Sequence, residues 1–240
     1  MNHVYTVCTG PNYFPWHVDR LKKEIEEHSS IEFKMYVYTT YPAEEFGKGI
    51  NVIPIKSDDG RRQWHKVDIF NMAPKGETCF IMDLDWTFYD DVTDILDQEV
   101  KENELIAPYR WWTFGRKGYH INGGLYKFIG GSLRIIPEVF YQDEHYWMQK
   151  YIKLEIAKPP VNGEQNFVEE TCVKNGVQIK YFEPSYAIGR WKDDPRGVLG
   201  YNVCYEKEYG FDNYLYGNVI DSRIRMLQSI LPDHVQLFRI

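Results

Sequence analysis

The sequence predicts one layered α/β domain built around a mainly parallel central sheet. Short apolar runs alternate with segments of helical periodicity through the first two thirds of the chain, and such alternation is typical of βαβ units. One run, Cys79-Phe80-Ile81-Met82, is apolar at every position. Strands that are covered on both faces have such continuous apolar sequences, so we expect this strand in the interior of the sheet.

The predicted strands and helices follow one another in a regular order. The expected strands cover residues 4–8, 33–39, 51–55, 79–82, 105–107, 125–129 and 178–182. The expected helices cover residues 15–27, 63–72, 92–96, 132–151 and 165–175. In the first helix Val18, Leu21 and Ile25 recur at helical spacing, and the second helix stops before Pro74.

The length of the chain fits a single domain of 240 residues. We expect its core over about residues 1–185 and an irregular C-terminal extension over about residues 186–240. From residue 197 onward tyrosines are frequent and hydrophobic periodicity is weak, so the sequence pattern assigns no particular elements there.

The composition argues against several classes of protein. The 28 basic and 35 acidic residues give a net charge of −7, whereas a protein that wraps nucleic acid needs a concentrated basic surface. No run approaches the roughly 18 apolar residues of a membrane span, and the first ten residues lack the features of a signal peptide. The cysteines form no C-x-x-C pair; they are Cys8, Cys79, Cys172 and Cys204. We therefore expect a cytoplasmic protein without an integral membrane segment.

The strongest local signal is the Asp-x-Asp motif (DxD) formed by Asp83 and Asp85, directly after the apolar strand. Two residues at alternate positions of a strand lie on the same face. At the carboxyl end of a parallel strand, where open α/β sheets bind ligands, two such acids can hold a divalent cation. The sequence near the motif offers no obvious basic partner that would make it an ordinary ion pair. The alternative is that the acids are only caps or solvated turn residues.

An ordered set of segments around this motif resembles the GT-A glycosyltransferases, in particular the glycogenin-like enzymes and their small bacterial and viral relatives. The set spans roughly residues 1–185 and consists of residues 4–21, 64–70, 83–85, 121–125 and 163–166. The resemblance implies a single GT-A (Rossmann-like) domain that moves a sugar from a nucleotide-sugar to a glycan or other hydroxyl acceptor. Among donors, the family resemblance favours a UDP-hexose. It also implies Mn²⁺ or Mg²⁺ as cofactor and favours a retaining outcome.

The resemblance also implies a set of donor-binding residues in this chain. They are Thr9, Tyr13, Thr39, Lys66, Asp83, Asp85, Asn122, Gly123 and Gly124. Thr9 and Tyr13 would hold the base and ribose, and Thr39 would close the pocket. Lys66 would approach the phosphates or the donor sugar as a point charge. The segment from Asn122 to Gly124 would bring backbone close to the sugar, because glycine has no Cβ.

The remaining candidates concern catalysis, the acceptor and the metal. Glu164 is the candidate catalytic residue, because the Glu164-Gln165 segment lies near the sugar and acceptor in the relatives, although aspartate is common where Glu164 stands. Gln165 and Trp112, from the aromatic run between the motif and Asn122, are the acceptor-binding candidates. His234 is the candidate third metal ligand beside Asp83 and Asp85, although the family's histidine-glycine motif is missing near the C-terminus.

Two other functions remain open on the sequence. The string from Asp83 to Thr87 resembles the first motif of haloacid-dehalogenase-like phosphatases, with Asp193 and Asp194 as a late acidic pair. Three predicted strands precede this string, whereas that motif usually lies on the first strand of its domain. The high aromatic content of 16% also suits a non-catalytic carbohydrate-binding protein, although such a protein needs no acidic pair at the end of a buried strand.

Overall fold

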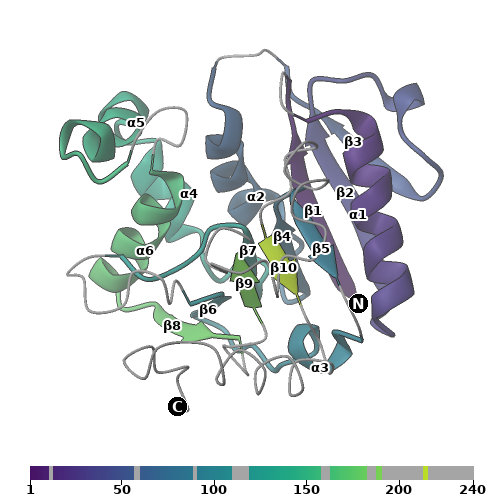
Figure 1. Ribbon diagram of the computed structural model, residues 1–240. Helices are drawn as coiled ribbons and strands as arrows, with labels where there is room; N and C mark the ends of the chain where they lie inside the picture. The colour runs from purple at the N-terminus through teal and green to yellow at the C-terminus, as the bar shows by residue number, and fades with distance from the viewer. Residues whose placement is uncertain are drawn as a thin grey trace, which may run out of the picture.

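The computed structural model of the chain describes residues 1–10, 13–56, 60–88, 91–109, 119–157, 163–182, 188–190 and 213–215. Its main body is a seven-stranded sheet in the order β3-β2-β1-β4-β7-β6-β8, with helices on both faces (Figure 1). A smaller sheet has the order β5-β10-β9. The predicted α/β class is therefore confirmed.

The strands of the main sheet are β1 (Asn2–Cys8), β2 (Phe33–Thr39), β3 (Ile50–Pro54), β4 (Thr78–Met82), β6 (Glu104–Ala107), β7 (Leu125–Ile129) and β8 (Gln178–Tyr181). All of them run in one direction except β7, which is antiparallel to both of its neighbours, β4 and β6. The sheet is thus mainly parallel, as the sequence predicts. Strand β4 lies between β1 and β7, which confirms its predicted interior position.

The helices are α1 (Pro15–His28), α2 (Lys66–Met72), α3 (Thr93–Leu96), α4 (Ile135–Phe140), α5 (Glu144–Lys153) and α6 (Glu164–Lys174), with 3-10 helices η1 (Ala43–Glu45) and η2 (Arg62–His65). Helix α1 covers one face of the sheet, and α2, α4 and α6 cover the other (Figure 1). Within the described ranges, no helix has both the length and the apolar character that crossing a bilayer requires.

Strand β4 belongs to both hydrophobic cores. Phe80 and Met82 pack into the core that includes α1, whereas Cys79 and Ile81 pack into the core that includes α2, α4 and α6. All four side chains are buried. Because successive side chains of a strand point to opposite faces, a strand covered on both sides has to be apolar throughout. This is the physical reason for the continuous apolar run in the sequence.

The predicted helix over residues 132–151 is broken in the structure. It forms two helices, α4 and α5, joined by Tyr141 to Asp143. The side chain of Asp143 caps α5 by accepting a hydrogen bond of 2.9 Å from the backbone N–H of Tyr146. An N-cap of this kind begins a new helix. The apolar periodicity therefore continues across the break, whereas the helical hydrogen bonding of the backbone is interrupted.

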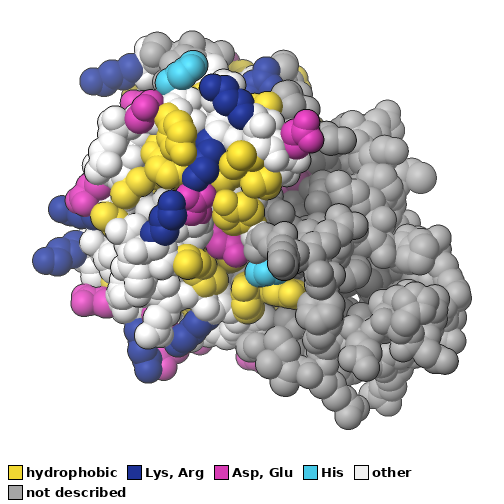
Figure 2. Space-filling view, turned by 90° about the vertical axis from the view of Figure 1, so that its left-hand side faces the viewer, with side chains coloured by type: hydrophobic (Ala, Val, Ile, Leu, Met, Phe, Trp, Pro, Cys, Tyr) yellow, Lys and Arg dark blue, Asp and Glu magenta, His cyan; other side chains and the backbone are white. Residues whose placement is uncertain are grey.

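The face formed by α4, α5 and α6 exposes a few large apolar side chains, among them Tyr146 and Val173. Hydrophobic side chains lie among lysine, arginine, aspartate and glutamate on this face (Figure 2). Scattered apolar groups of this kind are ordinary on protein surfaces. The groups that matter for function lie instead at the edge of the sheet where β4 ends.

Strand β5 (Trp86–Phe88) begins directly after the acidic motif and pairs with β10 (Asn213–Leu215) of the smaller sheet, which also contains β9 (Ile188–Arg190). Asp83, Leu84 and Asp85 therefore form the connection between two sheets. Strand β4 ends at Met82, as the predicted range 79–82 has it, so the rule that alternate strand residues share a face does not apply to Asp83 and Asp85. Residues 191–212 and 216–240 of the C-terminal extension lie outside the described residues.

Candidate active site

The candidate site lies where the carboxyl end of β4 meets the first residues of α2 and α6. The backbone N–H of Asp83 donates a 2.8 Å hydrogen bond to the carbonyl of Gly124, which extends the pairing of β4 with β7 by one step. Lys66 is the first residue of α2, and Glu164 is the first residue of α6. Four segments that are distant in the sequence thus converge on one point.

Lys66 links the other residues of the site. Its Nζ lies 2.8 Å from Oδ1 of Asp83 and 3.2 Å from Oε2 of Glu164, and it donates a 2.8 Å hydrogen bond to the carbonyl of Gly123. The side chain of Lys66 is only 4% exposed. Burial alone lowers the pKa of Lys66, but the attraction of Asp83 and Glu164 outweighs burial and raises this pKa above its ordinary value. Lys66 is therefore a charged ammonium group held by two acids and a carbonyl.

Glu164 has an environment that favours proton exchange near neutral pH. Its side chain is 3% exposed, and its Oε1 accepts a 3.2 Å hydrogen bond from the hydroxyl of Tyr126. Burial raises the pKa of Glu164 to about 7; Lys66 opposes this rise, whereas the negative charge of Asp83 adds to it. A carboxyl group with a pKa near the working pH can act as a general acid or base.

The backbone from Asn122 to Gly124 packs closely against neighbouring side chains of the protein. The N–H of Gly123 donates a 2.8 Å hydrogen bond to Oε1 of Gln165, and the N–H of Gly124 donates to Oδ1 of Asn122 at 2.9 Å. A Cβ added at Gly123 would lie 2.7 Å from Cβ of Gln165 and 2.8 Å from the hydroxyl oxygen of Tyr126. Glycine is thus required at this position by contact with α6 and β7, and this reason differs from the predicted approach to a donor sugar.

Asp83 and Asp85 supply the oxygen ligands that a hard divalent cation prefers. The side chain of Asp83 remains 33% exposed beside Lys66, whereas Asp85 is buried with 8% exposure. In the part of the chain that the structure describes, no group of three or more histidine, cysteine, aspartate or glutamate side chains gathers in a geometry suited to a metal ion. The two acids alone fit a cation in chemical type. His234, the predicted third ligand, lies outside the described residues.

The predicted base and ribose side of the pocket lies at the ends of β1 and β2. The buried hydroxyl of Thr39 donates a 2.7 Å hydrogen bond to the carbonyl of Cys8 and accepts one of 3.0 Å from the N–H of Tyr41. The hydroxyl of Tyr41 donates to the carbonyl of Tyr13 at 3.0 Å. Thr39 and Tyr13 are thereby tied together, and Thr9 follows directly after β1 with a partly exposed side chain. Trp112 lies outside the described residues.

Several contributors to the site escape the sequence analysis. Lys66 is the basic partner of Asp83, and the sequence near the motif does not reveal this ion pair. Tyr126 occupies a position in β7 that reads as ordinary core, yet its hydroxyl reaches Glu164. The indole N–H of Trp86 donates a 2.6 Å hydrogen bond to the carbonyl of Gly124. Tyr126 lies in a predicted strand and Trp86 directly after Asp85, but neither position identifies the partner of the ring.

Three of the cysteines are buried thiols that form no disulfide, namely Cys8, Cys79 and Cys172. Burial raises the pKa of the Cys8 thiol to about 12, which keeps it protonated and unreactive. Cys8 and Cys79 are fully buried and act as small core residues. Trp64, at the end of η2, is likewise a core residue, and its ring stacks on Phe140 with 5.2 Å between centroids.

No protein-family model and no curated protein matches the sequence. Solved structures do match. The galactosyltransferase LgtC, in complex with donor and acceptor sugar analogs, has a TM-score of 0.52 at 11% identity, and the match covers 98% of each chain. An active-site mutant of LgtC gives 0.52 at 10% identity with the same coverage.

The glycosyltransferase GlyE of Streptococcus pneumoniae TIGR4 matches with a TM-score of 0.53 at 16% identity, over 87% of this chain and 50% of that chain. At such identities these similarities concern the fold. The chain has the GT-A fold of these glycosyltransferases, as the resemblance of its motifs implies. The activity has to be argued from the site itself.

Proposed function

We propose that this chain is a metal-dependent glycosyltransferase, which moves a sugar from a nucleotide-sugar to a hydroxyl acceptor at the carboxyl end of β4. The observation that carries the proposal is the contact of Lys66 with both Asp83 and Glu164 at that edge of a GT-A fold. In open α/β sheets, ligands bind at the carboxyl ends of the strands. LgtC, which shares the fold, binds donor and acceptor sugar analogs, and this supports two sugar partners here.

Asp83 and Asp85 are the residues that would hold Mn²⁺ or Mg²⁺. When bound there, the cation would supply positive charge that stabilises the negative charge of the departing nucleoside diphosphate. Lys66 adds a fixed positive charge on the same side, which its two acidic partners keep protonated. We infer that the donor is a UDP-hexose and the acceptor a glycan or another hydroxyl compound, on the strength of the family resemblance.

Glu164 is the residue that we assign to the transfer step. Its carboxyl group can hydrogen-bond hydroxyls of the transferred sugar, and in an inverting reaction it would accept the proton of the acceptor hydroxyl. The resemblance to the glycogenin-like enzymes favours retention, in which case the hydrogen-bonding role is the relevant one. A cytoplasmic location is part of the proposal, and the dispersed free thiols support a reducing compartment.

The test is a screen of nucleotide-sugars for Mn²⁺-dependent release of nucleoside diphosphate. We expect release from at least one UDP-hexose by the wild-type protein and by Asp97→Asn, which alters an exposed acid away from the site, and none by Asp83→Asn. Hydrolysis of p-nitrophenyl phosphate without any nucleotide-sugar turnover would support the phosphatase instead. Glycan binding that needs neither metal nor nucleotide would support the carbohydrate-binding protein.

A further inference from the structure

Helix α6 contacts residues 119–124 at successive points along its length, and we call these six residues the 119–124 strip. Near the start of α6, Gln165 accepts the N–H of Gly123. One turn later, Glu169 accepts the backbone N–H groups of His120 and Ile121. Side chains of one helix thus accept several N–H groups of this stretch, while the N–H of Asn122 donates to the carbonyl of Pro108 at 2.8 Å.

Glu169 makes the central contact. Both of its carboxylate oxygens accept from the N–H of His120, at 2.8 and 2.7 Å, and one also accepts from the N–H of Ile121 at 3.0 Å. Glu169 is 7% exposed, and Ile121 is fully buried. Backbone N–H groups in such a place need an acceptor, and a carboxylate is a strong one. Glu169 is not among the residues assigned to the metal, the donor or the transfer step.

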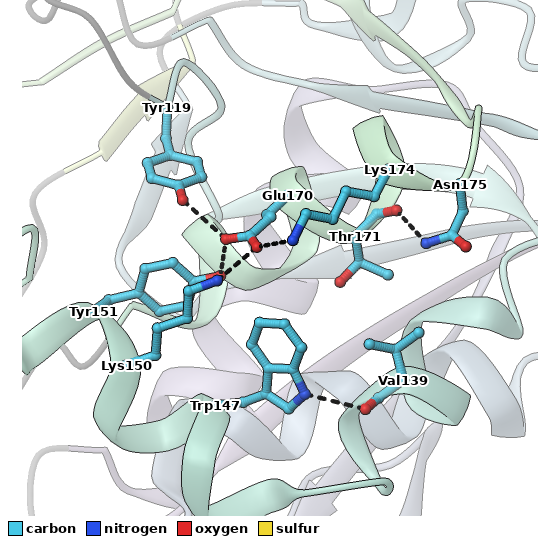
Figure 3. Close-up of polar contacts among 9 residues, drawn as sticks. All are labelled: Tyr119, Val139, Trp147, Lys150, Tyr151, Glu170, Thr171, Lys174 and Asn175. Atoms are coloured by element: carbon cyan, nitrogen blue, oxygen red, sulfur yellow. Dashed lines mark hydrogen bonds and ion pairs between the residues drawn. The ribbon is translucent and has the colours of Figure 1, made fainter. Parts of the chain in front are cut away.

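The neighbouring residue, Glu170, ties down the beginning of the strip. It accepts hydrogen bonds from the hydroxyls of Tyr119 at 3.0 Å and Tyr151 at 2.8 Å, and it pairs with Lys150 and Lys174 (Figure 3). Tyr119 is therefore joined to α5 and α6 through one carboxylate. The strip is held at its start by Glu170, in its middle by Glu169 and near its end by Gln165.

The end of the strip reaches the candidate active site. The carbonyl of Gly123 accepts the 2.8 Å hydrogen bond from Lys66, and the carbonyl of Gly124 accepts the N–H of Asp83. A shift of the strip would therefore move the groups that orient Lys66 and Asp83. Displacements of about 1 Å far from the reacting atoms can lower a rate roughly a hundredfold.

We propose that Glu169 is a positioning residue of the active site, which holds the 119–124 strip against α6 and thereby fixes Gly123 and Gly124 beside Lys66 and Asp83. This inference rests on the proposed glycosyl transfer. It assigns Glu169 no contact with donor or acceptor, since its carboxylate oxygens are occupied by the amides of His120 and Ile121.

The test compares Glu169→Ala and Glu169→Gln with Glu104→Ala. Glu104 is a suitable control because it is also buried, accepts one backbone N–H, from Lys101, and pairs with Lys180 on β8, away from the strip. Amide hydrogen exchange of the full chain is measured together with kcat and KM for the best nucleotide-sugar. The exchange readout reports on the strip without depending on turnover.

For Glu169→Ala we expect amide exchange at His120 and Ile121 to accelerate about tenfold or more, and kcat to fall roughly a hundredfold with a small change in KM. Glu169→Gln keeps one acceptor oxygen and should recover most of both losses. Glu104→Ala should lose stability while retaining kcat and normal exchange in the strip. The inference is overturned if Glu169→Ala exchanges normally at these amides, or if its kcat falls no more than that of Glu104→Ala. A wild-type protein that turns over no nucleotide-sugar would instead overturn the proposed function itself.

Discussion

The ammonium nitrogen of Lys66 lies 2.8 Å from Oδ1 of Asp83, at the point where β4 ends. The cation thus contacts the same carboxylate that we assign to the metal ion. Two positive charges cannot both approach one carboxylate oxygen without mutual repulsion. In the proposed function, Lys66 and the metal ion therefore compete for Asp83 until the negatively charged donor binds.

This competition gives Lys66→Met two effects of opposite sign. Mn²⁺ alone should bind more tightly to the variant, because the competing ammonium group is gone. The affinity for the nucleoside diphosphate in the presence of Mn²⁺ should fall, since charge-assisted contacts with phosphate contribute on the order of 1.5–3 kcal/mol. Isothermal titration calorimetry measures both affinities, with the exposed Lys75→Met as control. Unchanged or weaker binding of Mn²⁺ alone would refute the competition.

Glu164→Gln should separate transfer from donor binding. The variant keeps the size of the side chain and its contact with Tyr126, but it loses the negative charge beside Lys66. We expect near-normal affinity for the nucleoside diphosphate and a large fall in sugar transfer. Steady-state kinetics and calorimetry on the same preparation give the comparison, with the exposed Glu138→Gln as control. Transfer at the wild-type rate would contradict a role in transfer and leave Glu164 as an acid in the first turn of α6, where negative charge favours the helix dipole.

The sequence predicts much of the fold because its strands and helices are encoded locally. The prediction of β2 over residues 33–39 and of β7 over residues 125–129 agrees with the structure at both ends. Each strand carries its own alternating or continuous apolar pattern, which period-2 geometry translates directly into burial. The break between α4 and α5 escapes this reasoning, since apolar spacing persists through it and only the cap at Asp143 marks it.

The sequence names several residues that the structure brings together, but it does not predict how they contact one another. Lys66, Asp83, Gly123, Glu164 and Gln165 are all named by the motifs, and the structure brings these five residues together. Their pairing depends on how α2, α6 and β7 meet at one end of β4, which no local pattern encodes. The sequence accordingly assigns Lys66 to phosphate, whereas in the structure its Nζ contacts two acids. The sequence does not predict the role of Glu169 either, because its partners are backbone N–H groups and backbone partners leave no pattern in the sequence.

The cluster around Glu170 should make stability depend on acid pH. Burial alone raises the pKa of Glu170, but hydrogen bonds from two lysines and two tyrosines lower it from an ordinary value of 4.5 to about 2. Because the folded-state pKa is depressed, this stabilisation is complete above about pH 4.5 and is lost as the pH falls toward 2. Glu170→Gln should lower the free energy of unfolding by ~3 kcal/mol at pH 7 and by roughly half as much at pH 3. Urea unfolding at both pH values tests this, and an equal loss at the two would contradict it.

Lys127 should give a dependence of the same sign on the alkaline side, with stability rising as the pH rises. Its Nζ donates to the carbonyls of Leu96 and Gln98, and its side chain is buried. Burial lowers the pKa of Lys127 from 10.5 to about 8, while Asp97 opposes the change. Between these values the unfolded chain binds more protons than the folded one, so the contribution of Lys127 to stability rises with pH. Between pH 7 and pH 10.5, the unfolding free energy of the wild type should therefore rise by ~3 kcal/mol relative to that of Lys127→Met. A difference that stays constant over this range would show that Lys127 titrates normally in the folded protein.

The most direct test of the central claim is calorimetric titration of UDP and GDP into the wild-type protein and Asp83→Asn, each with Mn²⁺ and with EDTA. Asp97→Asn, at an exposed position outside the site, is the matched control. We predict that wild type and Asp97→Asn bind at least one of the nucleotides about tenfold or more tightly with Mn²⁺ than with EDTA, and that Asp83→Asn loses this difference while remaining folded. Nucleotide binding that is equally tight with EDTA, or a Mn²⁺-dependent affinity that survives in Asp83→Asn, would contradict the assignment of a metal-dependent donor site to the carboxyl end of β4.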